Sequence, residues 1–293
     1  MLPLRLAGGL HALARQQHKR LVACYPPHSL PDPDVLWDAI RIGLDDPGLP
    51  SWLDHPPQTN EVGRSAALMA GLLVLAHETR LPLALHELGA SAGLNLLLER
   101  YDICLGGTRA GMPGSTVTLR PDWSGPSPPD ATVRVVRRRG VDLNPLDVRN
   151  PAARDRLLAY VWPDQPDRMA RLAGALAIAQ ADPPMLDAGD AAEWTEAHIA
   201  LQPEAGVARV LMHSVAWVYF TAGTQARIAA RMEMAGRRAT ATAPLAWLRF
   251  EPPPGLLQPP ALRLQLWPGG ADRQLGTGGP HVHWMRWGDG QPV

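Results

Sequence analysis

The chain has 293 residues, of which 46% are hydrophobic, and 28 basic residues balance 28 acidic ones. This length and composition allow one large α/β domain, or a domain with an appendage, and argue against disorder throughout. The balanced charge removes the electrostatic argument for a nucleic acid or an anionic membrane as a partner.

Targeting and cysteine signals are equally sparse. No apolar run in the sequence reaches the length of a membrane span, and the first twenty residues lack a signal-peptide core. Cys24 and Cys104 provide neither a disulfide framework nor a Cys-x-x-Cys metal site. We therefore expect a cytoplasmic protein without a nucleic-acid or membrane partner.

Residues 1–80 are predicted to form an N-terminal helical region that packs on the rest of the chain. Leu10, Leu13 and Ala14 recur at helical spacing, and so do the apolar residues of 35–42. A proline-rich linker separates these segments. A cap-like stretch at 59–61 precedes an apolar helix that we expect over 62–77.

Strands and helices alternate from residue 81 onward. A strand is expected over 83–88, a helix over 92–101 and a β-rich insertion over about 103–138. The later elements continue the alternation: a helix over 152–181 broken at Pro163 and Pro166, strands over 184–187, 207–214 and 244–251, helices over 193–199 and 224–235, and closing strands over 262–267 and 281–287. The pattern predicts a Rossmann-like α/β domain over 81–293, with a mostly parallel, doubly wound sheet and a closing antiparallel hairpin.

The stretch HELGASAGLN, residues 86–95, has two incompatible interpretations. Because it follows an expected strand and opens an expected helix, it suits a backbone loop that binds a nucleotide-like ligand. The residues that would line such a loop are Glu87, Gly89, Ala90, Ser91, Gly93 and Asn95.

The same letters include G-x-S-x-G, the nucleophile elbow of serine hydrolases. Ser91 would then be the nucleophile, with Asp190 or Asp272 and His281 or His283 as partners. The preceding eighty residues argue against this alternative, because that fold normally places several strands before the elbow.

Three further groups of polar residues are candidates for ligand binding or catalysis. Asn60, Glu61 and Arg64 head an apolar helix, where they either function or only cap the helix. Asp142 follows an extended stretch and suits the two hydroxyls of a ribose, although a simple turn explains it equally well. Asp190 would accept from an adenine amino group or cap the next helix.

His213 and Glu251 end two later strands, and we consider both as catalytic groups together with Glu61 and Arg64. Aromatic residues follow His213 at 217–220 and would wall a ligand site or belong to the core. His281 and His283 would supply half of a metal site, but no third ligand is identifiable, so we expect no metal.

The whole chain resembles the bacterial domain-of-unknown-function family 2332, which has no established activity. The resemblance rests on five segments: 58–64, 87–95, 140–145, 246–251 and 266–270. More loosely, the order of elements resembles the class I S-adenosylmethionine-dependent methyltransferases.

The methyltransferase resemblance implies S-adenosylmethionine as the cofactor. It maps Glu87, Gly89 and Gly93 onto the acid and the outer glycines of the first motif, with Ser91 in place of the middle glycine. It makes Asp142 the ribose acid and Asp190 the acid near adenine. We therefore expect a small-molecule-binding protein, a methyltransferase of unknown acceptor, with a serine hydrolase and a non-catalytic ligand-binding protein as alternatives.

Overall fold

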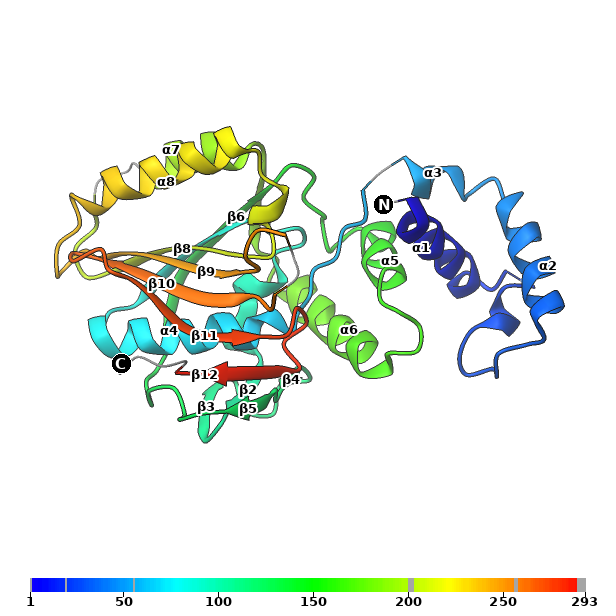
Figure 1. Ribbon diagram of the computed structural model, residues 1–293, viewed down its shortest axis with the longest axis horizontal. Coiled ribbons are helices and arrows are strands. Elements are labelled where there is room, and N and C mark those ends of the chain that lie inside the picture. The colour runs from blue at the N-terminus through cyan, green and yellow to red at the C-terminus, as the bar shows by residue number, and fades with distance from the viewer. Residues whose placement is uncertain (1, 19, 55, 200–202, 256–257, 289–293) are drawn as a thin grey trace. The chain divides into compact units, whose positions relative to one another are not determined.

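The computed structural model describes residues 2–18, 20–54, 56–199, 203–255 and 258–288 (Figure 1). They form two compact units. The helical unit consists of Met1–Asn60 and Leu146–Gln180, and the α/β unit of Glu61–Pro145 and Ala181–Val293. The predicted boundary at residue 80 does not coincide with this division. In the described ranges, no helix has the length and apolar character needed to cross a membrane.

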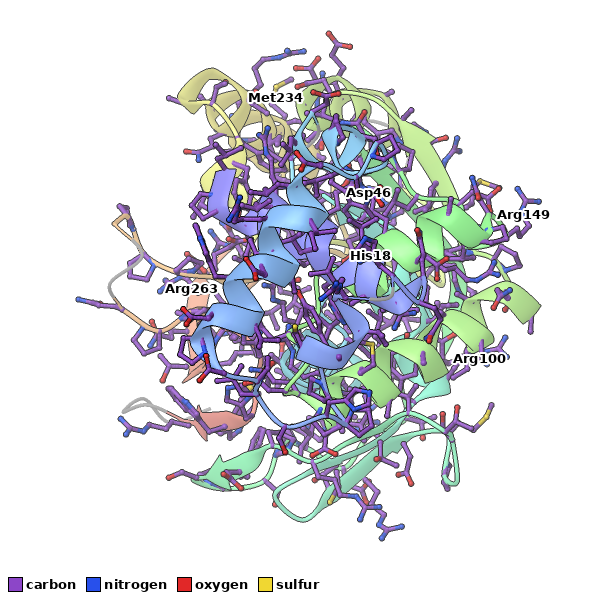
Figure 2. The ribbon with its side chains drawn as sticks, turned by 90° about the vertical axis from the view of Figure 1, so that its right-hand side faces the viewer. His18, Asp46, Arg100, Arg149, Met234 and Arg263 are labelled. Atoms are coloured by element: carbon purple, nitrogen blue, oxygen red, sulfur yellow. The ribbon has the colours of Figure 1, made fainter. Side chains whose placement is uncertain are left out.

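Short helices build the helical unit. They are α1 (Leu2–Arg15), the 3₁₀ helix η1 (Val22–Cys24), α2 (Pro33–Leu44), α3 (Pro50–Leu53), α5 (Pro151–Ala159) and α6 (Pro166–Ala181), whose last residue belongs to the α/β unit. Leu10 and Leu13 are buried in a cluster with Leu21 and Leu49, as their helical spacing predicted. His18 and Asp46, labelled in Figure 2, approach to 4.0 Å between Nε2 and Oδ2.

A nine-stranded mixed sheet forms the centre of the α/β unit. Its strands are β1 (Leu83–Leu88), β5 (Asp122–Ser124), β6 (Val135–Asp142), β7 (Met185–Ala188), β8 (Ala208–Ser214), β9 (Leu245–Glu251), β10 (Ala261–Trp267), β11 (Asp272–Gly278) and β12 (Trp284–Trp287). They lie in the order β5-β12-β11-β10-β9-β8-β1-β6-β7. The sheet is mostly parallel, as predicted, and also has antiparallel parts.

The five strands from β7 to β9 in this order run parallel to one another. The chain proceeds from β1 outward to β6 and β7 and then returns to β8 on the other side of β1. The strand order therefore reverses between β1 and β8. All seven residues of β8 are buried, as is usual for a central strand of a parallel sheet.

The chain closes as an antiparallel meander rather than a two-stranded hairpin. β10 pairs with β9 and β11, and β12 pairs with β11. The segment between the two predicted closing strands contains β11, and a Cβ on Gly276 would lie 2.4 Å from the Arg286 carbonyl oxygen. The glycine thus permits a close approach between strands and does not mark a loop.

The predicted insertion is shorter than expected. β2 (Asp102–Leu105), β3 (Thr108–Gly111) and β4 (Thr118–Leu119) form a separate three-stranded sheet. β5 joins the edge of the large sheet beside β12. β6, which the prediction divided between the insertion and the main domain, pairs with β1 along its length.

Helices cover both faces of the large sheet (Figure 1). They are α4 (Arg64–Thr79), α7 (Ala191–Ile199) and α8 (Ala222–Gly236). The same unit also contains the 3₁₀ helices η2 (Leu94–Arg100) and η3 (Trp217–Tyr219). A Cβ on Gly71 of α4 would lie 2.3 Å from Leu248 of β9, whereas Trp247 packs in the cluster of α7 and α8. Adjacent strand residues point to opposite faces, so α4 and α8 lie on opposite sides of the sheet.

Candidate functional site

The carboxyl ends of the five parallel strands meet at one edge of the sheet. Parallel strands bring the loops that follow them to the same edge, and ligands bind there where the strand order reverses. In this unit the reversal lies between β1 and β8. A ligand site is therefore expected at the loops after β1, β6 and β8.

The loop after β1 has a left-handed backbone at three alternate residues. Gly89, Ser91 and Gly93 have φ of 65°, 53° and 72°. A Cβ on Gly89 would lie 2.7 Å from the Ala216 side chain, so this loop contacts the segment that follows β8. Ser91 adopts the conformation that glycine adopts most easily, which is the reason a glycine would be usual at this position. The expected helix after the loop is the 3₁₀ helix η2.

Asp142 fixes this loop to its neighbours. Its Oδ2 accepts a hydrogen bond from the Ser91 amide (2.9 Å), and its Oδ1 accepts from the Asn144 amide (2.9 Å). The Asp142 carbonyl oxygen accepts from the Gly189 amide (3.0 Å), and Ala90 donates to Val141. Asp142, which the sequence offered as a ribose acid, thus lies beside the glycine loop.

Glu87 is buried at the end of β1. Its Oε1 accepts from Asn95 Nδ2 (3.3 Å), and Asn95 Oδ1 accepts from Ser65 Oγ of α4 (2.8 Å). No described residue hydrogen-bonds Glu87 Oε2. Burial raises the pKa of Glu87 to about 8, and the charge of Asp142 adds to this rise against the opposing effects of Asn95 and Arg64. Most Glu87 side chains are therefore protonated at neutral pH.

Glu61 and Arg64 lie at the start of α4 and both contact the turn before β12. Glu61 Oε1 accepts from the Gly63 amide (3.0 Å), and Glu61 Oε2 lies 3.0 Å from His281 Nδ1. The His281 ring is not aligned for a hydrogen bond at this distance. Arg64 donates through Nε to the Pro280 carbonyl oxygen (3.0 Å) and through Nη1 to that of Ser214 (3.1 Å). Arg64 therefore links the start of α4 both to the end of β8 and to the turn before β12.

His213 and Glu251 form a second histidine–glutamate pair on the face of the sheet that α8 covers. His213 Nδ1 lies 2.7 Å from Glu251 Oε1, and Trp247 Nε1 donates to His213 Nε2 (3.1 Å). Because the indole can only donate, His213 Nε2 is the acceptor and Nδ1 carries the proton. Trp217 stacks on the His213 ring with centroids 5.0 Å apart. Both nitrogens of His213 are thus engaged inside the protein.

Glu251 also organises the loop after β8. Its Oε1 accepts from the amides of Ala216 (3.0 Å) and Trp217 (3.2 Å), while Oε2 is buried without a described hydrogen-bond partner. The loop that contacts Gly89 is therefore held in place by Glu251.

Asp190 has a role in the helix that follows β7. Asp190 caps α7, because its Oδ1 accepts from the amides of Ala192 (2.8 Å) and Glu193 (3.1 Å). This is the structural alternative that the sequence offered. Asn60 is buried and is the last residue of the first segment of the helical unit, one position before the α/β unit begins.

The arrangement required of a serine hydrolase is not seen around Ser91. No described residue hydrogen-bonds Ser91 Oγ, which is buried. Asp190 caps a helix, and Asp272 pairs with Arg249 and Arg263. The positive φ of Ser91 suits an elbow, but it suits a glycine-like ligand loop equally well.

Sequence reasoning missed the pairing of His281 with Glu61. It treated His281 only as a metal ligand or a hydrolase histidine, because nothing local connects residues so far apart in the chain. Within the described ranges, no three His, Cys, Asp or Glu side chains are grouped as a metal site would require.

A family model described as "Uncharacterized protein conserved in bacteria (DUF2332)" matches residues 1–287. The chain therefore belongs to this family, and the resemblance expected from the five sequence segments is confirmed. No curated protein and no solved structure matches the chain. These comparisons provide no support for the resemblance to methyltransferases, which stays a prediction.

Proposed function

We propose that this member of the bacterial DUF2332 family binds S-adenosylmethionine at the carboxyl end of β1 and is a methyltransferase. The observation that carries the proposal is a pair of buried polar atoms without described partners, Glu87 Oε2 and Ser91 Oγ. Both lie where the strand order reverses. Buried polar atoms are normally hydrogen-bonded, and exceptions need an explanation such as a ligand.

The strand order supports a Rossmann-like interpretation of the sheet. Numbered along the chain, the five parallel strands lie in the order 3-2-1-4-5, which is that of the doubly wound nucleotide-binding folds. β10 then pairs antiparallel with the fifth strand. Folds of this kind host many functions, so the proposal depends on the site and not on the strand order.

The donors and acceptors of the site fit the parts of S-adenosylmethionine. Glu87, with its unpartnered oxygen, would accept from the ammonium group of the methionine part, which would also favour the charged carboxylate. Asp142 would accept from the ribose hydroxyls. Gly89 and Gly93 give the loop its left-handed turns and pack against Ala216 and Pro184. The cofactor would supply an electrophilic methyl group.

Isothermal titration with S-adenosylmethionine and with its demethylated product tests the proposal. We expect both to bind, and we expect Glu87→Gln and Asp142→Asn to weaken binding by about 10-fold or more, the usual effect of losing a charged hydrogen bond. Asp182→Asn is the matched control. It removes an exposed carboxylate that pairs with Arg100 and Arg138 before β7, at the opposite edge of the sheet.

A folded sample that binds neither compound would overturn the proposal. Tight binding without methyl transfer to any of a panel of acceptors would leave a ligand-binding protein and overturn the enzymatic half. A fluorophosphonate probe that labels the wild type but not Ser91→Ala would instead identify a serine hydrolase.

A further inference from the structure

The second nitrogen of His281 distinguishes this histidine from His213. The His281 side chain is 37% exposed, and no described residue hydrogen-bonds its Nε2. Its Nδ1 is buried next to Glu61, whose side chain is only 5% exposed. We propose that His281, oriented by Glu61, is the general base of the active site and that the acceptor is a hydroxyl compound. This inference rests on the proposed function.

Glu61 is held in a position from which it can orient the ring. The Gly63 amide fixes its Oε1, which leaves Oε2 facing His281 Nδ1 at 3.0 Å. A carboxylate at Nδ1 favours the tautomer with the proton on Nδ1 and a lone pair on Nε2. Hydrogen bonds of catalytic groups are often poorly aligned before the substrate binds, so the present ring angle is compatible with this role.

The backbone around His281 is tied to the end of β8. Arg64 binds the carbonyl oxygens of both Pro280 and Ser214, and Ser214 is the last residue of that strand. A Cβ on Gly63 would lie 2.4 Å from the His281 carbonyl oxygen, so the two turns are in close contact. His281 is therefore anchored at the edge of the sheet where we propose that the cofactor binds.

The chemistry of this pair is removal of one proton. The acceptor O–H bond breaks, the proton goes to Nε2 of His281, and the bonding electron pair stays on the acceptor oxygen as the nucleophile. Glu61 stabilises the resulting imidazolium. A hydroxyl group needs such a base because it is a weak nucleophile while protonated, whereas a carboxylate or a thioether does not. A hydroxyl is also less acidic than a thiol or an ammonium group, so it depends most on such a base and is the acceptor that we propose.

Nitrogen-15 NMR of the histidine side chains tests the orientation without any cofactor. We expect His281 in the wild type to show a protonated Nδ1 and a bare Nε2, and a mixture of both tautomers in Glu61→Gln. Acylation by diethyl pyrocarbonate should be faster at His281 than at His283, which is exposed on the same turn, and slower in Glu61→Gln. A proton on Nε2 in the wild type would overturn the proposal.

Turnover measurements separate this role from a structural one. We expect His281→Gln to lower kcat for hydroxyl acceptors about 100-fold or more while S-adenosylmethionine still binds, and His283→Gln to change neither. Unchanged turnover in His281→Gln, or transfer only to amines, carboxylates or thiols, would overturn it. Failure of the wild type to bind the cofactor would instead overturn the proposed function and leave the NMR result standing.

Discussion

Two histidine–glutamate pairs lie at the carboxyl edge of the same sheet, and their surroundings differ. His213 is fully buried, and both its nitrogens have partners in Glu251 and Trp247. His281 is partly exposed, and only its Nδ1 faces a carboxylate. The same two residue types thus build a closed structural cluster in one case and an open pair in the other.

The two histidines differ in whether the second ring nitrogen has a hydrogen-bond partner, and this difference indicates their roles. Removing a fully partnered buried group leaves its partners unsatisfied and costs stability. Polar groups kept for a ligand are unsatisfied already, so removing them costs little or even stabilises the fold. The sign and size of a stability change can therefore separate the two kinds of residue at this edge.

The largest effect is expected from His213→Ala. This change removes a buried ring and leaves the Trp247 indole and Glu251 Oε1 without that partner, so the free energy of unfolding should fall by about 2–4 kcal/mol. His281→Ala should lower it by less than about 1 kcal/mol, because the His281 ring is partly exposed and its Nδ1 makes no aligned hydrogen bond. Urea denaturation of both variants measures the difference, and equal losses would contradict the comparison.

Glu87 provides a second effect, of opposite sign. Because the folded-state pKa of about 8 is raised from 4.5, the folded protein holds a proton that the unfolded chain releases. The stabilisation that protonated Glu87 provides is fully present below about pH 4.5 and is lost as the pH rises through 8. Glu87→Gln does not titrate, so its stability should exceed that of the wild type at pH 9 and match it at low pH.

Thermal unfolding of the wild type and Glu87→Gln across this pH range provides the measurement. Asp182→Asn, which changes an exposed carboxylate, should follow the wild type at every pH. Parallel curves for Glu87→Gln and the wild type would show that Glu87 ionises normally in the folded protein.

Much of the α/β unit was predictable because its central strands are buried on both faces and read as short apolar runs. β6 was harder, since Arg138 and Arg139 suggested a solvated segment. In the structure Arg138 pairs with Glu99 and Arg139 with Asp187. Such distant ion pairs let charged residues occupy a strand inside the sheet, and no local pattern reveals them.

The candidate site was predictable to the same extent. Glu87, Gly89 and Asp142 follow strands, so their meeting at one edge could be expected from the parallel topology. The pairing of Glu61 with His281 could not, because it depends on how α4 meets the turn before β12. The sequence also could not show which histidine would be partly exposed, since the partners of His213 lie on a neighbouring strand.

The smallest effect is expected at Ser91, where the backbone is left-handed with a φ of 53° and the hydroxyl has no described partner. Ser91→Gly should raise the free energy of unfolding by up to about 1 kcal/mol, because glycine adopts this conformation without strain and the gain exceeds the added entropy of the unfolded chain. Ser91→Ala keeps the Cβ and the strain, so it is the matched control for loss of the hydroxyl alone. Urea denaturation of both variants separates the two causes. Destabilisation by Ser91→Gly together with a neutral Ser91→Ala would mean that the serine conformation is not strained.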